Sequence, residues 1–532
     1  MFEVLWGEIV YYVHKEIEDP YKTGLDMAYE VSNKIKNPSL MILLTSLTKK
    51  EDIAELLNGL KSKIDVSKLI GCTTAGEFSE HKFTQNGALL IVFDEYCKMA
   101  IEYKKINNND SKNLGISLAK SVLKKLKNIS SRISLDEKLV GFVFFDWNSD
   151  SENEIIGGIS NVLSGVPIIG GTSGDCFKFE KTFQIYQDKV LENSVVMALG
   201  ICSKKMDVIY GHGYKPTQYY ARVTKAEGNV VYELDGKPAF EVYAKMISDH
   251  TKIPYEEIVK KFKPQNFKNL DLALLYPLGV HDTYGNYHIK FLKSVEGNAL
   301  VLMHKVKEGT FLVMMETTPE NTRKSREEAI EKIKNKFKNP IIFVIDCACR
   351  WVIENSISGR ICRIQTTSGN TLQPPENNSI FQRPSLNIKE NLWGQCSVGF
   401  LSYGESIIKG TLSYHNTLTF VGLVIDSADE RINWKEELKY FEFSDDEVEV
   451  ISLLIGKKLT AKEMLEKVRI SQTKLYQILN ELENRGIIRS DEGKPKKFYI
   501  DNLKEVLERI HLELENQYHF KKKKRKELLS KL

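Results

Sequence analysis

Two glycine-marked segments place hydroxyl groups, free backbone N–H groups and a carboxylate within a few residues of one another. They cover residues 71–77 and 170–175, and each directly follows an apolar run typical of a buried strand. Glycine lets a ligand approach the backbone closely, and open α/β sheets bind ligands at the carboxyl ends of their strands. We therefore predict a small-ligand site, against the alternative that these glycines only shape sharp turns. The predicted ligand-binding residues here are Cys72, Thr73, Thr74, Gly76, Glu77, Gly170, Gly171, Thr172, Ser173 and Asp175.

Four polar residues further along the chain extend this prediction, namely Arg350, Glu405, His415 and Asn416. The guanidinium of Arg350 can bind a ligand carboxylate through two hydrogen bonds, and Glu405 or Asp175 can bind an ammonium group. The same side chains can equally form structural ion pairs. The two glycine segments match neither a P-loop nor a GxGxxG pattern, so the sequence does not predict a nucleotide site.

The cysteines offer a third kind of chemistry, because Cys347 and Cys349 follow an apolar run. A catalytic thiol needs a neighbouring base and a lowered pKa, and the sequence does not place the candidate base His415 near either thiol. Buried, inert thiols are favoured, and we predict no catalytic residue and no enzymatic activity. No second thiol pair or His-x3-His pattern accompanies them, so no metal site and no cofactor are predicted. The eight cysteines form no CxxC pair, which favours reduced thiols.

The C-terminal part has the pattern of two short helices followed by a charged hairpin. Residues 461–468 and 472–485 each carry an apolar stripe, and Ser471 can cap the second helix. The outward face of that helix offers donors and acceptors for base edges, and lysines follow at the hairpin. The predicted DNA-binding residues are Gln472, Thr473, Lys474, Tyr476, Gln477, Lys494, Lys496 and Lys497. Between residues 471 and 500 six basic residues face four acidic ones, a small excess that leaves protein docking as the alternative.

Alternating strand and helix patterns surround the glycine segments. Apolar runs at 40–45, 88–93, 139–145 and 166–169 predict strands, and Ser151-x-x-Glu154 predicts a capping box at a helix start. A second sheet-rich part follows from about residue 225. Its predicted strands are 272–276, 299–303, 311–315, 341–345, 398–403 and 417–425, with a long polar loop at 356–392. The fold class is therefore α/β (α+β) and multi-domain.

The length and composition agree with several soluble domains. The chain has 532 residues, of which 42% are hydrophobic and 27% charged, and its net charge of +4 neither favours nor excludes nucleic acid. No apolar run reaches the roughly 18 residues of a membrane span. The polar N-terminal segment is unlike a signal peptide. We predict a cytoplasmic protein without a membrane partner.

The glycine segments and the residues around 183–190 resemble the FIST N domain, a sensory module of intracellular signalling proteins. Residues 346–350, 399–405 and 414–416 resemble the FIST C domain that accompanies it, although Cys349 stands where the family tends to carry glycine. The resemblance implies binding of a small ligand, such as amino acids or related metabolites. Some members are thought to bind haem as gas sensors, and the candidate axial ligands here are His212, His281, His288, His304 and His415.

The C-terminal pattern resembles the winged helix of TrmB-type archaeal transcription regulators, on the helix start at 461–463, the segment 471–476 and the wing at 492–499. We predict a FIST N domain at 1–225, a FIST C domain at 226–426, a linker at 427–440, a winged helix-turn-helix at 441–502 and a helical basic tail at 503–532. The expected function is that of a ligand-sensing one-component transcription regulator, which binds double-stranded DNA as a homodimer. The alternatives are a signalling scaffold with a protein-binding winged helix, a haem-based gas sensor, and, least favoured, an enzyme that uses the thiols.

Overall fold

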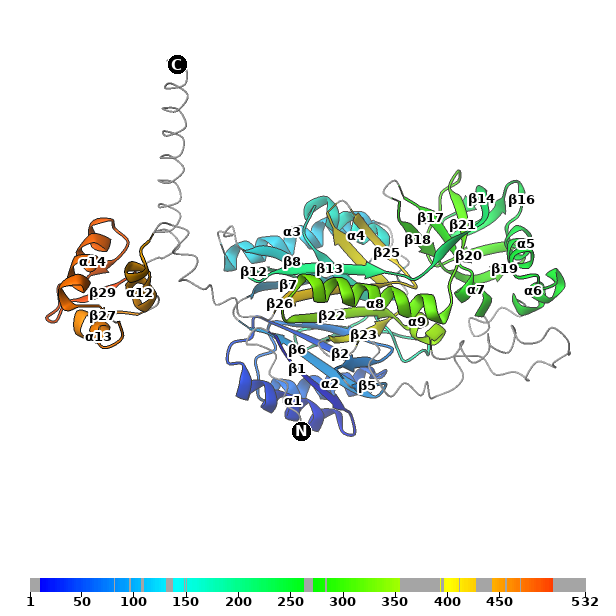
Figure 1. The fold of residues 1–532 in the computed structure, drawn as a ribbon. Coiled ribbons are helices and arrows are strands. Elements are labelled where there is room, and N and C mark those ends of the chain that lie inside the picture. Colours follow the sequence, from blue (N-terminus) through cyan, green and yellow to red (C-terminus); the bar gives the residue numbers. More distant parts are fainter. Residues whose placement is uncertain are drawn as a thin grey trace, which may run out of the picture. The chain divides into compact units, whose positions relative to one another are not determined.

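The computed structural model divides into two compact units, residues 1–428 and 429–532 (Figure 1). It describes residues 10–500 except 81, 95–96, 107–109, 131–136, 148, 150, 263–270, 283–284, 355–392, 394–396, 411, 427–442, 455–456 and 469. The predicted loop at 356–392, linker at 427–440 and tail at 503–532 lie almost wholly outside these residues. Each unit is described separately below.

The first unit contains three six-stranded sheets with the same internal order. In the first sheet an edge strand pairs with an antiparallel strand, a parallel pair follows, and a two-stranded hairpin ends the sheet. Its order is β1 (Val10–Glu16), β6 (Gly87–Phe93), β2 (Leu40–Thr45), β3 (Leu69–Thr73), β10 (Gln184–Tyr186) and β11 (Lys189–Leu191).

The other two sheets repeat this order with other strands. The second runs β7 (Cys97–Lys105), β12 (Ser194–Cys202), β8 (Lys138–Phe145), β9 (Ile168–Thr172), β24 (Glu405–Lys409) and β25 (Leu412–Asn416). The third runs β13 (Met206–Gly211), β26 (Phe420–Asp426), β22 (Pro340–Cys347), β23 (Ser397–Ser402), β4 (Glu77–Ser79) and β5 (Lys82–Thr84). In each sheet the central pair is parallel.

The three sheets arise from a threefold repeat of the chain, over residues 10–93, 97–202 and 206–426. Each repeat contributes strands, helices and one hairpin, and the hairpin leaves its own sheet to pair with the parallel strand of another repeat. Hairpin β4–β5 joins β23, β10–β11 joins β3, and β24–β25 joins β9. The three exchanges close a ring, so no repeat completes its sheet alone. Sequence reasoning did not identify this repeat.

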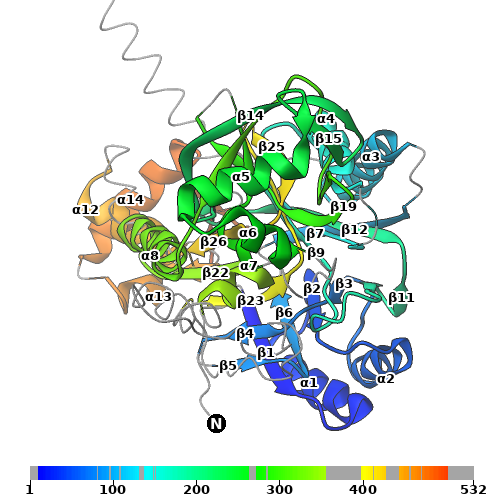
Figure 2. The ribbon, with the colours of Figure 1, turned by 90° about the vertical axis from the view of Figure 1, so that its right-hand side faces the viewer.

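Apolar side chains from all three sheets form one central core. The ring of Phe142 lies with its centroid 5.5 Å from that of Phe93 and 5.6 Å from that of Phe343, which come from the other two sheets. Helices cover the outer faces, as Figure 1 and Figure 2 show. They are α1 (Pro20–Lys34), α2 (Lys50–Lys61), α3 (Ser111–Ile129), α4 (Glu152–Val162) and α8 (Pro319–Lys336).

One glycine recurs at the same place in each parallel pair, opposite a residue of the neighbouring strand. A Cβ atom there would overlap the carbonyl oxygen of that residue, so only glycine allows the two strands to approach. The distance from the added Cβ atom to the carbonyl oxygen would be 1.8 Å for Gly71 and Leu43, 2.1 Å for Gly170 and Val143, and 1.9 Å for Gly399 and Val344. The glycine-marked segments therefore begin inside strands, as a requirement of packing.

A separate module is inserted in the third repeat, between β13 and α8, and Figure 1 shows it in green. Its eight-stranded sheet contains β14 (Lys215–Glu227), β15 (Val230–Leu234), β16 (Lys237–Pro238), β17 (Leu278–His281), β18 (Tyr287–Lys290), β19 (Leu292–Glu296), β20 (Ala299–Leu302) and β21 (Phe311–Glu316). Its helices are α5 (Ala239–Thr251), α6 (Tyr255–Phe262) and α7 (Asp271–Leu275). The border that the sequence analysis places at residue 225 falls inside β14.

Three local predictions were wrong. The strand predicted at 272–276 is helix α7, because a short apolar run does not distinguish a strand from a buried helix. Ser151 precedes α4, but its hydroxyl donates to the carbonyl of Ser149 at 2.8 Å and forms no cap. Cys97 and Cys202 lie opposite each other on β7 and β12 and form a disulfide rather than two reduced thiols.

The second unit contains α12 (Asp445–Leu454), β27 (Leu459–Thr460), α13 (Ala461–Leu465), α14 (Gln472–Asn484), β28 (Arg489–Ser490) and β29 (Lys497–Tyr499). The strands form one small sheet in the order β27-β29-β28. Ser471 caps α14 by accepting from the Lys474 N–H at 3.2 Å, as predicted. The predicted buried stripe is confirmed for Leu475, Ile478, Leu479 and Leu482. Gly486, with φ of 66°, ends the helix.

Two adjacent glycines in α4 provide a matched test of close helix packing. A Cβ atom on Gly158 would lie 2.1 Å from the carbonyl oxygen of Lys112 in α3, whereas one on Gly157 would meet nothing within 4 Å. We expect Gly158→Ala to lower the free energy of unfolding by about 1–3 kcal/mol through overpacking. Gly157→Ala should raise it by about 0.5–1 kcal/mol, because alanine loses less backbone entropy in a helix. Urea unfolding followed by tryptophan fluorescence measures both, and equal effects would contradict this packing.

Candidate functional site

The two predicted glycine segments lie together in the structure, and a third segment, residues 399–405, occupies the equivalent place in the third repeat. Backbone hydrogen bonds join the three strand ends in a cycle. They run from the Ala75 N–H to the Leu401 carbonyl, from the Gly174 N–H to the Thr73 carbonyl and from the Thr172 N–H to the Gly404 carbonyl, each at 2.8 Å. The carboxyl ends of the three parallel pairs thus converge, which is where sheets of this kind present functional groups.

Each of the three segments ends in a buried carboxylate, namely Glu77, Asp175 and Glu405. Glu77 accepts hydrogen bonds from the hydroxyls of Thr74 at 2.5 Å, Ser46 at 3.0 Å and Thr84 at 3.1 Å. Since Thr84 lies on β5, its hydrogen bond to Glu77 holds the hairpin β4–β5, which pairs with β23 of another repeat. Burial raises the pKa of Glu77 to about 8.

Glu405 repeats the arrangement of Glu77. It accepts from the hydroxyl of Ser402, three residues earlier, at 2.5 Å and from that of Thr419, beyond its hairpin, at 2.8 Å. Burial raises the pKa of Glu405 well above its ordinary value, and the nearby Cys347 adds to the shift. The donors that the structure gives to both carboxylates come from the protein itself.

Asp175 is also held from within. Its Oδ1 accepts from the Tyr403 hydroxyl at 2.6 Å and the Phe179 N–H at 2.9 Å, and its Oδ2 accepts from the Glu180 N–H at 2.7 Å and the Lys181 N–H at 3.0 Å. The three predicted carboxylates therefore anchor turns.

The neutral residues of the two segments lie in the same interior. Thr73 accepts from the Phe183 N–H at 3.0 Å, and Ser173 donates to the Phe145 carbonyl at 2.8 Å. Cys72 is buried, and burial raises the pKa of its thiol. Gly76 has φ of 148°, which requires glycine. Gly171 packs against Ile345, Phe400 and Ser402.

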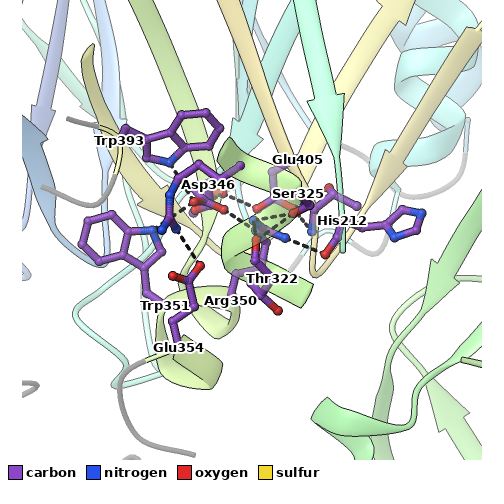
Figure 3. Close-up of polar contacts among 12 residues, drawn as sticks. His212, Thr322, Ser325, Asp346, Arg350, Trp351, Glu354, Trp393 and Glu405 are labelled. Atoms are coloured by element: carbon purple, nitrogen blue, oxygen red, sulfur yellow. Dashed lines mark hydrogen bonds and ion pairs between the residues drawn. The ribbon is translucent and has the colours of Figure 1, made fainter. Parts of the chain in front are cut away.

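Arg350 forms a buried ion pair at the start of α9 (Ala348–Val352), and Figure 3 shows its surroundings. Its Nε donates to Asp346 Oδ1 at 2.8 Å, and both groups are fully buried. The remaining guanidinium nitrogens donate to the carbonyl of His212 at 2.5 Å and to that of Thr322 at 3.4 Å. The guanidinium also lies 4.9 Å from the centre of the Phe420 ring.

The other carboxylate oxygen of Asp346 is saturated as well. It accepts from the indole N–H groups of Trp351 at 3.0 Å and Trp393 at 2.9 Å. Of the two interpretations offered for Arg350, this geometry is that of a structural ion pair, since both partners use their hydrogen-bonding capacity internally.

The candidate thiol Cys347 and the candidate base His415 each have their own surroundings in the structure. Cys347 is buried, and burial raises its pKa well above the ordinary value, which keeps the thiol protonated. His415 bonds instead to the hydroxyls of Ser406 at 2.6 Å and Thr172 at 3.1 Å. Among the residues that the structure describes, no group of three His, Cys, Asp or Glu side chains is arranged to hold a metal ion.

Around His415 and Asn416, several buried polar atoms have no hydrogen-bond partner. They are Asn416 Oδ1, Thr417 Oγ1 and His304 Nε2. The imidazole rings of His304 and His415 lie 5.3 Å apart at nearly a right angle. Lys290 lies close enough for its charge to lower the pKa of both, after burial, which is the larger cause. The sequence analysis named His304 only as a candidate haem ligand and did not identify Lys290.

In the second unit the predicted outward face of α14 is exposed. Gln472, Thr473, Lys474, Tyr476 and Gln477 all face solvent, and Tyr476 retains 44% of its surface.

The predicted wing lysines are exposed as well. Lys496 pairs with Glu483 at 3.2 Å. Among the described residues, Lys494 and Lys497 form no ion pair. The apolar side of α14 is held by the core of the unit, so its polar side is free to contact another molecule.

No helix among the described residues has both the length and the apolar character needed to cross a membrane.

Comparison with known proteins connects the three parts of the chain to families. The model of the FIST N domain matches residues 39–237, that of the FIST C domain matches residues 239–407, and that of the sugar-specific transcriptional regulator TrmB matches residues 438–503. The chain is 42% identical over 520 residues to "Uncharacterized protein MJ1623" of Methanocaldococcus jannaschii, covering 97% of this chain and 99% of that protein. Among solved structures, TrmBL2, titled an archaeal chromatin protein, matches 19% of this chain and 42% of its own at 22% identity, with a TM-score of 0.17.

The buried pair makes a prediction about stability. Asp346→Ala leaves the guanidinium of Arg350 buried without its counter-charge, and we expect the free energy of unfolding to fall by about 3–5 kcal/mol. Glu320→Ala is the matched control, because it removes an exposed carboxylate that pairs with Arg323 at 2.9 Å, and it should cost less than about 1 kcal/mol. Urea unfolding of the full chain measures both. Similar losses in the two variants would contradict a structural role for the buried pair.

The raised pKa of Glu77 predicts how stability changes with pH. Between the ordinary pKa of 4.5 and the folded value of about 8, the folded protein holds a proton that the unfolded chain releases. The contribution of Glu77 to stability is therefore complete below the lower value and declines as the pH rises through the window. We expect wild type to lose on the order of 4 kcal/mol relative to Glu77→Gln between about pH 5 and about pH 8. Parallel unfolding profiles for the two proteins would show that burial does not shift this group.

Proposed function

Because the chain belongs to the FIST family and ends in a TrmB-type winged helix domain, we propose that it is a one-component transcription regulator. In this proposal residues 1–428 bind a small ligand and the second unit binds double-stranded DNA. Along the chain, this proposal keeps the predicted boundaries at 426, 440 and 502, whereas the one predicted at 225 falls inside β14. The protein acts in the cytoplasm, as a homodimer.

The observation that carries the proposal is the exposed polar face of α14 above a fully buried apolar stripe. Leu475 and Leu479 fix the helix in the core, while Gln472, Lys474 and Gln477 extend outward. Amide side chains can bind adenine through two hydrogen bonds, and lysine can bind guanine, when such a helix enters the major groove. The capping box of Thr460 with Glu463 and the cap of Ser471 define both helix starts.

The modest charge of this unit supports a dimer. The wing contributes Lys494 and Lys497 as unpaired cations among the described residues, whereas Lys496 is partly used by Glu483. Since each phosphate contact adds a limited, salt-dependent increment, two copies on symmetric half-sites provide the affinity that one copy lacks.

The haem alternative receives less support from the candidate histidines. Both ring nitrogens of His415 and His288 are hydrogen-bonded, and Nδ1 of His212 accepts from the Tyr214 N–H at 2.9 Å. His304 has a free Nε2, but its described neighbours include Lys290 and His415, whose polarity suits a small polar molecule better than a macrocycle. An absorption spectrum of the purified protein tests this alternative: a Soret band would support bound haem, and its absence would count against haem.

DNA binding can be tested with two kinds of variant once a preferred site has been selected from a random duplex library. Gln477→Ala should lower the preference for that site over random DNA by about 1–3 kcal/mol, because it removes a contact to a base edge. Lys494→Ala should weaken binding to all sequences alike and reduce the slope of log affinity against log salt by about 1 per protomer.

Fluorescence anisotropy across a salt series measures both effects, with Lys245→Ala in α5 as a control on the other unit. Failure of the full chain to bind any duplex, together with binding of a protein through the same face, would favour the scaffold alternative.

A further inference from the structure

We infer that the seam between β18 and β25 is the ligand site of the sensory unit and that it binds a small carboxylate carrying a hydroxyl or ammonium group. The seam is defined here by Lys290, His304, Asn416 and Thr417. This inference rests on the proposed sensory function and names its site and its ligand class.

The first observation is a group of unused hydrogen-bonding atoms in the protein interior. Asn416 is 2% exposed, Thr417 is 3% exposed and His304 is 7% exposed, and each has a side-chain atom without a partner. A buried polar atom left unpaired costs free energy, so folded proteins satisfy nearly all of them. Three such atoms on two neighbouring segments indicate that a partner comes from outside the chain.

The second observation is geometric and places these atoms together. The amide Nδ2 of Asn416 on β25 lies 3.3 Å from Nδ1 of His288 on β18, two residues before Lys290. His304, just beyond β20, lies with its ring 5.3 Å from that of His415, the residue before Asn416. Figure 1 shows β18 and β20 in the inserted module and β25 in the three-sheet body.

The body closes the other side of this seam. The ring of Phe145, the last residue of β8, lies 5.9 Å from that of His415. The side chain of Asn153 in α4 accepts from the His415 N–H at 2.9 Å. Lys305, next to His304, pairs with Glu154 of the same helix at 2.7 Å. The seam therefore lies at the carboxyl end of the parallel pair β8 and β9, and the ion pair of Lys305 with Glu154 connects the inserted module to this part of the body.

The charge of the seam selects the ligand. The side chain of Lys290 is partly buried, and its ammonium group forms no hydrogen bond or ion pair with any residue the structure describes. Burial lowers the pKa of this group to about 8. A buried cation without a counter-charge is costly, and an anionic ligand supplies the missing partner. Lys293 likewise pairs with no carboxylate in the described chain, and it lies 6.0 Å from the ring of Trp147, whose buried indole N–H has no acceptor.

The free atoms also require a donor on the ligand. Asn416 Oδ1 is an acceptor, and the contact of Nδ2 with His288 sets the orientation of the amide. A carboxylate satisfies Lys290 and His304, and a hydroxyl or ammonium group on the same molecule satisfies Asn416. Sulfate offers no donor at neutral pH, whereas a hydroxy or amino carboxylic acid carries both the anionic group and the donor that this set of atoms requires.

The experiment uses the full chain and a panel of small hydroxy and amino carboxylic acids, each paired with its carboxamide. We expect at least one acid, but not its amide, to raise the midpoint of thermal unfolding, and calorimetry then gives its Kd. Lys290→Met should weaken that Kd by about ten- to hundredfold, the effect of losing one charge-assisted hydrogen bond. The exposed Lys245→Met in α5 should leave it unchanged.

The acid and amide pair separates a lost contact from a damaged fold. Loss of the Lys290 contact removes the preference for the acid over the amide, whereas misfolding lowers the affinity for both. Without ligand, Lys290→Met should also raise the unfolding midpoint, because it removes an uncompensated buried cation. An acid that binds Lys290→Met as tightly as wild type would overturn the site, and a panel without any stabilising acid would overturn the ligand class. Either result leaves DNA binding by the second unit intact, which the anisotropy assay measures independently.

Discussion

The exchange of hairpins between the three repeats is the interaction on which the rest of the first unit depends. An open sheet leaves a row of unpaired N–H and carbonyl groups along each edge strand. Here β3, β9 and β23 would each be such an edge, and each is covered by a hairpin from another repeat. A repeat taken alone would expose both its sheet edge and its share of the common aromatic core. We therefore expect the three repeats to fold and unfold as one unit, in agreement with the single compact body of residues 1–428.

The same constraint explains why the most conspicuous polar residues of the sequence are buried and saturated. A hairpin that crosses to another sheet must turn sharply at the end of its parent strand, in the interior, where backbone and side-chain polar groups need partners. Glu77 and Glu405 provide them with the same geometry, a hydroxyl three residues earlier and a threonine at the far side of the hairpin. Asp175 does so with three backbone N–H groups. These carboxylates organise the ring, and a ligand contact is not needed to account for them.

Sequence reasoning predicted the parts of the structure that local patterns determine. The caps and the apolar stripe of α14, the strands at 40–45 and 139–145, and the FIST and TrmB assignments follow from residues close in the chain. The threefold repeat was missed because its copies share little beyond two glycines, one hydroxyl and one carboxylate, and because the inserted module separates β13 from the rest of the third copy. The match of the FIST C model begins at residue 239, inside that module. The border between the two family models therefore does not coincide with a border between packed units of the structure. Lys290 was missed for a simpler reason, since a lysine in a short strand reads as a surface residue.

The contrast between saturated and unsaturated polar groups is the physical argument that separates structural from ligand-binding residues here. Arg350 and Asp346 combine charge, burial and a place at a strand end, yet every strong interaction available to them is made within the chain. Lys290 and Asn416 carry less obvious chemistry. In the described structure, however, the charge of Lys290 has no counter-charge and the acceptor Oδ1 of Asn416 has no donor. Retaining an uncompensated group lowers stability, and such a cost persists in proteins where function requires it. A ligand that answers both groups would also tie β25 to β18, and β25 belongs to one of the three exchanged hairpins. Binding at the seam would therefore act on the element that connects the third repeat to the second, and this gives the sensor a route by which a small molecule can alter the whole ring.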